Sequence, residues 1–355
     1  MRGKLQKPGI IDLPAQAGGE DGKRPFDYGK FLAKDDIYHT LSFAEVSVLS
    51  SGHGNVIKDL LFKIKKSFVT KTKEILAEPY ASLLSGLIVS GKVAMPKNIL
   101  EEFQRAGVIH IVVLSGYNIT IIAEFMRTVF RSARFSIIGI ILFVIMTGAE
   151  ATVVRAALMV LTVILAKMFG RKFSPSRALL VAAFIMLLEN PKILVFDPSF
   201  QLSFLATIAL IYVVPIVEKY LKKVPEKLGL RTTIATTIAT QVTVLPLLIY
   251  SIGNVSLVSL PANILILFFI PATMLVGFIA TLIAYVSGVL ALPFSYATHL
   301  LLAWILGVSH YLGNLSFASI TIPPAPWWLV VLVYLVIIIL IRRLRSSLPH
   351  SPNSN

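Results

Sequence analysis

Polar side chains interrupt several segments of this sequence that are otherwise apolar enough to lie in a membrane. In residues 107–126, Ser115, Tyr117 and Asn118 cluster around Gly116 near the middle of the segment. Polar groups at that depth must be satisfied by protein or by water. One interpretation is a broken helix that exposes backbone groups to a cavity, as in transport sites. The other is close packing in which Ser115 and Asn118 hydrogen-bond to a neighbouring helix.

Arg155 is the one permanently charged residue placed well inside the apolar segment 150–169. If the segment is helical, Arg155 lies about 7 Å deeper than Glu150. An intramembrane arginine faces a partner or water rather than lipid, and its planar fork suits phosphate. Arg155 is therefore the best candidate for contact with a polyanion. An ion pair with Glu150 or Glu124, or snorkelling of the side chain, is the alternative.

Residues 197–204 begin with a helix-start signal. Asp197 is expected to be the N-cap, because proline follows it at the first helical position. Gln201 and Ser203 come within about a turn of this start and could line an opening. Hydrogen bonding between helices explains them equally well.

A polar stripe runs along residues 232–243, where Thr233, Thr237 and Gln241 recur every four residues. A water-filled path requires such a stripe. Threonines in membrane helices also satisfy their hydroxyls on their own backbone, so this alternative stays open. Asn263, in a later apolar segment, is a further candidate for the same path.

Catalytic and metal chemistry are not expected. The chain has no cysteine, and its six histidines show no ligand spacing. No Ser and His pair, HExxH motif or pair of intramembrane aspartates is present. We therefore expect no enzyme activity, no metal and no cofactor.

The composition indicates how these residues are positioned. Of the 355 residues 56% are hydrophobic and 14% are charged, the mean hydropathy is +0.80 and the net charge is +15. Soluble domains carry roughly 25% charged residues. We predict an all-α polytopic membrane protein with nine or ten transmembrane or re-entrant helices. The candidate segments are 107–126, 134–149, 150–169, 177–195, 200–217, 232–252, 256–272, 273–291, 294–313 and 327–341.

The first 80 residues have a different character. Residues 1–24 are predicted to be a flexible leader, and 25–52 contain a strand-forming segment at 37–49. Residues 53–79 place apolar residues on one stripe and lysines mostly elsewhere, which favours a basic amphipathic helix in the membrane interface. A solvated helix packed on a soluble domain is the alternative. Residues 80–345 form the membrane domain, and 346–355 a disordered tail.

Basic residues predict the orientation. They concentrate in the loops at 127–134, 167–177 and 218–231, which should therefore be cytoplasmic. Residues 1–100 then lie outside. The tail residues Arg342 and Arg343 also favour the cytoplasm, which four crossings after residue 253 would not allow. One later segment, near Pro261 and Pro271, is therefore expected not to cross fully.

The order of several motifs resembles the competence domain of the ComEC family of DNA-uptake membrane proteins. The motifs are LLSGLIVSG at 83–91, EEFQRAGVIHIVVLSGYNI at 101–119, RAALM at 155–159, GRKFSP at 170–175 and DPSFQLSF at 197–204. The resemblance covers roughly residues 80–340. Asn118 and Tyr117 stand where the family usually has His and Leu, so a role of that histidine does not transfer.

The resemblance implies a function and a short form of the family architecture. Residues 25–52 resemble the end of the family's OB-like extracytoplasmic domain, so we expect a β-containing remnant. No HxHxDH-type cluster follows residue 340, so we expect the presumed nuclease domain to be missing. The implied function is a multi-pass inner-membrane channel for single-stranded DNA in natural transformation.

Alternatives and partners remain open from the sequence. A secondary transporter of a small anionic solute shares broken helices and a buried arginine with a DNA channel. The expected partners are single-stranded DNA and the lipid bilayer. A separate nuclease, a DNA receptor, a cytoplasmic motor and self-association into an oligomer are further candidates.

Overall fold

The structure is a computed structural model. It describes residues 2–13, 24–45, 47, 50, 54–89, 95–112, 116–226, 229–323 and 325–346. The chain forms two compact units. Unit 1 comprises residues 1–100, 109–201 and 269–307, and unit 2 comprises residues 101–108, 202–268 and 308–355.

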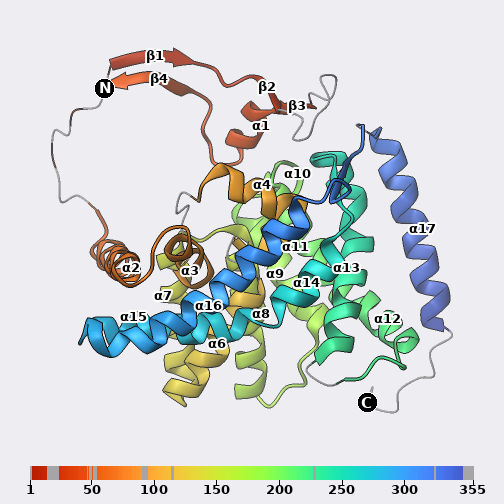
Figure 1. The fold of residues 1–355 in the computed structure, drawn as a ribbon. Helices are drawn as coiled ribbons and strands as arrows, with labels where there is room; N and C mark the ends of the chain where they lie inside the picture. The colour runs from red at the N-terminus through yellow and green to blue at the C-terminus, as the bar shows by residue number, and fades with distance from the viewer. Residues whose placement is uncertain are drawn as a thin grey trace. The chain divides into compact units, whose positions relative to one another are not determined.

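Unit 1 begins with two small antiparallel sheets and one short helix (Figure 1). β1 (Arg2–Gln6) pairs with β4 (Thr40–Glu45), and β2 (Ile10–Leu13) pairs with β3 (Arg24–Asp27), which leads into α1 (Tyr28–Ala33). β4 lies within residues 37–49, where a strand-forming segment was predicted. β1 and β2 fall within the predicted flexible leader, so that prediction was wrong for these residues. Their pairing partners lie farther along the chain, where local composition does not reveal them.

The long basic helix expected next is present as α2 (Val56–Ile75). The side chain of Asn55 caps it by accepting hydrogen bonds from the backbone N–H groups of Ile57 and Lys58, at 2.9 and 3.3 Å. α3 (Tyr80–Val89) follows and is buried from Ala81 to its last residue. α2 packs on α3, α7 and α15 within unit 1.

The centre of unit 1 is a group of apolar helices that lie side by side (Figure 1). They are α6 (Gly116–Phe130), α7 (Ala133–Thr147), α8 (Ala151–Met168) and α9 (Pro175–Glu189), with the short α5 (Ile109–Val112) and α10 (Ile193–Phe196) beside them. Ile119, Phe143, Val153 and Ala156 form a buried core between α6, α7 and α8. α15 (Ile270–Ala284) and most of α16 (Gly288–Gly313) also belong to unit 1.

Unit 2 contains the end of a long helical segment and three further helices. α11 (Pro198–Ile208) continues through the π-helical turn η1 (Ala209–Val213) into α12 (Val214–Tyr220). Pro215 explains the turn, because a proline has no N–H to donate and its ring displaces the carbonyl four residues earlier, that of Ile211. α13 (Leu230–Ser251) packs against α12, α14 (Ser259–Leu267) and α17 (Trp327–Ser346).

Three other elements connect unit 2 to earlier and later parts of the chain. α4 (Lys97–Arg105) leads into it from unit 1. β5 (Asn254–Ser256) pairs antiparallel with β6 (Ser319–Thr321). The connection that follows α13 and the one that precedes α17 therefore lie together.

Five of the described helical segments are long and apolar enough to cross a membrane. They are Ala151–Met168, Pro198–Tyr220, Leu230–Ser251, Gly288–Gly313 and Trp327–Leu344. Ser259–Leu267 and Ile270–Ala284 pass the same test only as a pair, with a 42° bend between them. The predicted all-α polytopic membrane fold is confirmed. α7 and α9, at 15 residues each, are shorter than the roughly 20 residues that a perpendicular span requires.

The boundaries of two predicted segments were wrong. The chain was divided at 272/273, whereas the structure divides it at Phe268 and Phe269. The resulting bent pair agrees with the prediction that one segment near Pro261 and Pro271 does not cross fully. Predicted segment 107–126 contains α5, described up to Val112, and α6, described from Gly116. Residues 113–115 lie outside the described part of the chain.

Candidate functional site

Arg155 lies in the helical core of unit 1 and faces the first residue of α6. It is 8% exposed, although arginine is among the residues least often buried. A Cβ atom built on Gly116 would lie 2.7 Å from Nη2 of Arg155 and 3.7 Å from the Cβ of Ala156. Glycine at this position therefore makes room for the guanidinium group against the backbone of α6.

Asn118 lies half a turn further along α6. Its side chain is 2% exposed, and Nδ2 donates a hydrogen bond of 3.3 Å to the backbone carbonyl of Leu87 in α3. This contact agrees with the packing interpretation of Asn118. Of the other two candidates in this motif, Ser115 and the side chain of Tyr117 lie outside the described residues.

Glu124, one of the proposed partners of Arg155, is engaged elsewhere. Its Oε1 lies 2.6 Å from Nη2 of Arg127, in an exposed pair on α6. Glu150, the other proposed partner, is the N-cap residue of α8. Unit 1 therefore combines a buried guanidinium, a glycine that accommodates it and a buried amide within a short stretch of α6 and α8.

A second polar cluster lies in unit 2. Nε2 of Gln241, on α13, donates to Oγ of Ser259 at 2.6 Å and to the carbonyl of Ser256 at 3.4 Å. Ser259 in turn donates to the same carbonyl at 3.4 Å. The cluster therefore joins the middle of α13 to β5 and to the first residue of α14.

Asn263 extends this cluster by one turn along α14. It is 7% exposed, and its buried Oδ1 has no hydrogen-bond partner among the described residues. An unsatisfied buried amide oxygen is unfavourable by about 1–3 kcal/mol, so a water molecule or ligand is expected to bind there. Gly107, at φ +75°, packs against the same turn, where an added Cβ would lie 2.5 Å from the Cβ of Ser259.

The threonine stripe on α13 is largely satisfied by its own helix. Oγ1 of Thr237 donates to the carbonyl of Thr233 at 2.8 Å, and Oγ1 of Thr243 donates to the carbonyl of Ala239 at 2.8 Å. These hydroxyl protons are therefore not available to another acceptor. Gln241, on the same stripe, is the residue that reaches another element.

The capping prediction for α11 is confirmed. Oδ1 of Asp197 accepts hydrogen bonds from the N–H groups of Ser199 and Phe200, at 2.9 and 3.4 Å. Gln201 donates from Nε2 to the carbonyls of Leu194 and Val195, at 2.9 and 3.0 Å, and so closes the end of α10.

Ser203, the remaining candidate on α11, is half-buried. Its carbonyl accepts a hydrogen bond of 3.0 Å from Oγ1 of Thr207. The polar contacts of this segment are thus local to α10 and α11, and they do not join Gln201 or Ser203 to the two clusters described above.

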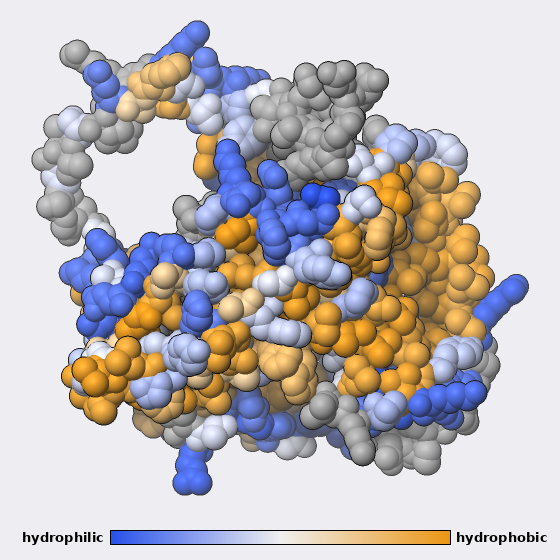
Figure 2. All heavy atoms as spheres, in the orientation of Figure 1, coloured by the Kyte–Doolittle hydropathy of each residue, from blue (hydrophilic) through white to orange (hydrophobic). Residues whose placement is uncertain are grey.

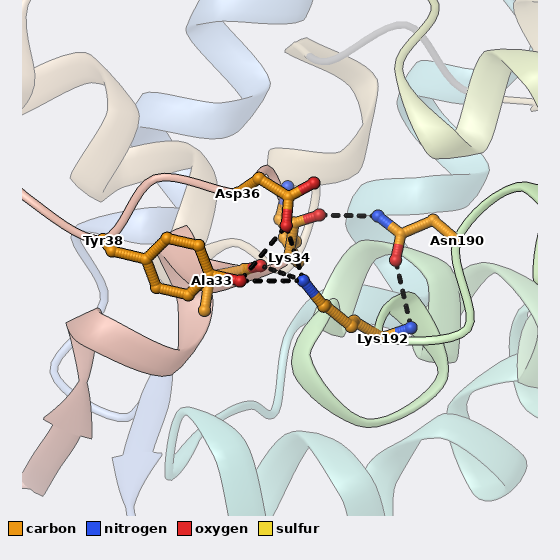
Figure 3. Close-up of polar contacts among 6 residues, drawn as sticks. All are labelled: Ala33, Lys34, Asp36, Tyr38, Asn190 and Lys192. Atoms are coloured by element: carbon orange, nitrogen blue, oxygen red, sulfur yellow. Dashed lines mark hydrogen bonds and ion pairs between the residues drawn. The ribbon is translucent and has the colours of Figure 1, made fainter.

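A further polar site was not predicted from the sequence (Figure 3). Nζ of Lys192 lies 2.6 Å from Oδ1 of Asp36, 3.1 Å from the hydroxyl of Tyr38 and 3.2 Å from the carbonyl of Ala33. Asn190 donates from Nδ2 to the carbonyl of Lys34 at 2.6 Å. We call these contacts the Lys192 latch. They fasten the segment after α1 to the turn between α9 and α10.

Charge pairing perturbs both ionisable groups of this latch. The hydrogen bond from Lys192 lowers the pKa of Asp36 below its ordinary value, and the hydrogen bond from Tyr38 acts in the same direction. The hydrogen bond to Asp36 raises the pKa of Lys192. The latch is therefore charged on both sides at neutral pH. The sequence does not indicate this pairing, because Asp36 lies 156 residues from Lys192 along the chain.

No group of three or more His, Cys, Asp or Glu residues that could hold a metal ion occurs in the described ranges. The chemistry that the two clusters offer is recognition by a guanidinium group, by amides and by hydroxyls. Such donors bind an anion or the polar edges of a nucleic acid.

Sequence comparison with known proteins identifies the family of the chain. The family described as competence protein matches residues 87–346, which include α6, α8, α13 and α14. The chain belongs to the competence protein family. It is also 25% identical over 358 residues to ComE operon protein 3 of Bacillus subtilis (strain 168). No solved structure matches the chain.

The alignment covers very different shares of the two proteins. The alignment covers 98% of this chain and 44% of ComE operon protein 3. The chain thus spans less than half the length of the relative that it matches. The family match itself contains both polar clusters of the membrane domain.

Proposed function

We propose that this competence-family protein takes up DNA, by conducting single-stranded DNA across the inner membrane into the cytoplasm during natural transformation. The family match and the similarity to ComE operon protein 3 support a role in competence. The observation that carries the DNA assignment is the buried guanidinium of Arg155, packed on Gly116 within an apolar helix group. A phosphodiester is an anion that such a planar fork recognises well.

The path that we propose uses the residues of the two clusters. Arg155 and Asn118 would serve it in unit 1, and Gln241 and Asn263 in unit 2. Arg155, Asn118 and Asn263 are each more than nine-tenths buried, so a strand can reach them only if neighbouring helices separate. The structure would then correspond to a closed form, which opens when DNA and its partners are engaged.

The proposed orientation of the chain in the membrane supports delivery of DNA into the cytoplasm. The pairing of β5 with β6 supports a position of residues 254–256 and 319–321 on the same side of the membrane. The chain between them must return to the side from which it starts, and α17 then crosses to the other side. This brings Arg342 and Arg343 to the same side as the basic loops at 127–134, 167–177 and 218–231, which is the cytoplasm by the distribution of basic residues.

The Lys192 latch is consistent with this orientation. It joins the N-terminal segment to the turn between α9 and α10. In the proposed orientation this turn is on the opposite side from the basic loops. Residues 24–45 would therefore lie outside the membrane, on the side where DNA arrives. We propose no catalytic step for this chain. A motor, a nuclease and a DNA receptor are further proposed components of the uptake system.

A secondary transporter of a small anionic solute is the second candidate. The 42° bend between α14 and α15 favours it, because discontinuous helices often form ion and substrate sites in transporters. Both candidates use a buried cation, and they differ in the size of the anion that the cation would bind. Transport of a labelled small anion by the reconstituted protein, with no uptake of DNA in cells, would favour the transporter.

Variants at Arg155 test the proposed function. Arg155→Lys keeps the charge but loses the fork, so DNA uptake in a transformable host should fall in part, whereas Arg155→Gln should lose most of it. Membrane abundance is measured in parallel, because loss of a purely structural ion pair would lower abundance instead. In that case a charge-swapped Glu150→Arg/Arg155→Glu pair should restore abundance. Normal uptake by Arg155→Gln at normal abundance would contradict a role in recognition.

A further inference from the structure

The surface of α2 carries an open hollow with an unusual set of side chains. Its lining consists of Lys63, Lys66, Ser67, Thr70, Lys71, Glu74 and Tyr285, and its volume is about 440 Å³. Three ammonium groups face one carboxylate, and three hydroxyl groups lie among them. We propose that this lysine hollow binds the phosphate headgroup of an anionic phospholipid.

The hollow is held in shape by contacts between α2 and the end of α15. Oγ of Ser67 and the hydroxyl of Tyr285 lie 2.8 Å apart. In the same interface, Oγ1 of Thr72 lies 3.3 Å from Oγ1 of Thr281, and both residues are fully buried. The ring of Phe68 stacks on that of Phe278 with centroids 6.0 Å apart. The hydroxyls of the hollow are thus fixed by a packed interface.

The lysines of the hollow are available to an anion to different degrees. Lys63 pairs with Asp59 at 2.8 Å, and Lys71 pairs with Glu74 at 2.7 Å, where its Nζ also lies 5.9 Å from the ring centroid of Tyr285. Lys66 is exposed, and among the described residues it forms no ion pair. A phosphate in the hollow would therefore meet one unengaged ammonium group and two that can be shared.

The apolar residues of the same helix favour lipid as the occupant. Val56, Leu60 and Ile64 recur every four residues and are 81%, 58% and 52% exposed. Leu60 and Ile64 lie seven residues before Ser67 and Lys71, so they share a helix face with the hollow. Over α2, hydrophilic surface adjoins hydrophobic surface (Figure 2). An anionic lipid matches both parts, because its acyl chains cover apolar residues while lysines contact its phosphate.

A nucleic acid is a poorer match for this surface. Single-stranded DNA would satisfy the lysines, and one base could stack on Tyr285, which is 49% exposed. It would leave the row from Val56 to Ile64 facing water or paired with a charged backbone. The proposal requires membrane residence of the chain but is independent of DNA conduction. The two ideas can therefore fail separately.

The test compares two variants that each remove two positive charges from α2. Lys66→Gln/Lys71→Gln changes the hollow, and Lys58→Gln/Lys73→Gln changes lysines that do not line it. The full chain is purified in detergent and titrated with phosphatidylglycerol or phosphatidylcholine of the same acyl composition, and bound lipid is counted by native mass spectrometry. Lys66→Gln alone is added, because it breaks no ion pair of the described residues.

The wild-type chain and the Lys58/Lys73 control should retain phosphatidylglycerol equally and in preference to phosphatidylcholine. The Lys66/Lys71 variant should bind it about 30-fold more weakly, and Lys66→Gln alone about 5-fold more weakly. Inorganic phosphate at the same concentration should not displace the lipid. Equal loss in the control, no preference between the two lipids, or displacement by a single-stranded oligonucleotide with the same dependence on Lys66 would each overturn the proposal.

Discussion

Replacement of Gly116 by alanine should strain the site of Arg155 in a measurable way. The added Cβ would lie 2.7 Å from Nη2 of Arg155, about 0.7 Å closer than the nearest ordinary van der Waals contact. The guanidinium group must move, and because Arg155 is only 8% exposed it has little open space into which to move. Overpacking of this kind destabilises a folded protein by about 1–3 kcal/mol. Gly116→Ala should lower both the free energy of unfolding in detergent and the uptake of DNA in cells.

A matched control and a double mutant make this prediction specific. Gly307 lies in α16 with nothing within 4 Å of an added Cβ, so Gly307→Ala should be neutral or stabilising by up to about 1 kcal/mol. In an Arg155→Ala background, Gly116→Ala has no guanidinium group to displace, and the loss of stability should fall below about 0.5 kcal/mol. Equal stability of the two glycine variants, or an undiminished loss in the Arg155→Ala background, would refute the packing of Arg155 on Gly116.

Four further predictions concern other parts of the chain. Gly107→Ala should destabilise unit 2 by about 1–3 kcal/mol in the same unfolding assay, because the residue has φ +75° and an added Cβ would lie 2.5 Å from its nearest neighbour. Lys192→Met should release the N-terminal segment and raise hydrogen exchange in residues 28–38 at neutral pH, whereas unchanged exchange would argue against the latch. In the wild-type chain the pKa of Asp36 is lowered. Ionised Asp36 therefore stabilises the latch above about pH 3.8, and this stabilisation is lost as the pH falls through the lower pKa of the folded state. The pKa of Lys192 is raised. Charged Lys192 therefore stabilises the latch below about pH 10.5, and this stabilisation is lost as the pH rises through the higher pKa of the folded state. A spin label in this segment should stay immobile between these limits. In intact cells an impermeant thiol reagent should label a cysteine at Ser319 but not one at Ser132, and the reverse pattern would invert the proposed orientation.

Local signals were sufficient to predict most of the helices. The cap at Asp197 and the amphipathic pattern of α2 depend on neighbours within a few turns, and both are confirmed. The balance of basic loops predicted an incomplete crossing near Pro261 and Pro271, but the 42° bend between α14 and α15 and its position were not predicted. The strands β1 and β2 were missed, because a two-stranded sheet depends on its partner more than on its own composition.

The candidate site was predictable in its residue types but not in its contacts. Arg155 stands out in the sequence, since a charge inside an apolar segment requires an explanation. That it packs on Gly116 follows from the crossing of α6 and α8, which periodicity does not define. Gln241 was one of several polar residues on its stripe. The fold distinguishes it, because Thr237 bonds to its own helix and Gln241 bonds to Ser259.

Site-specific photocrosslinking during DNA uptake tests the central claim most directly. A photoreactive amino acid is placed at Asn118 or Gln241, and at Leu180 and Phe184 as controls, which are 69% and 64% exposed on α9. Labelled DNA is supplied to transformable cells that depend on this chain, and crosslinks are induced while uptake proceeds. The account predicts crosslinks from incoming single strands to Asn118 and Gln241, and none to Leu180 or Phe184. Uptake at normal efficiency without crosslinks to Asn118 or Gln241, or with equal crosslinking at all four positions, would contradict it.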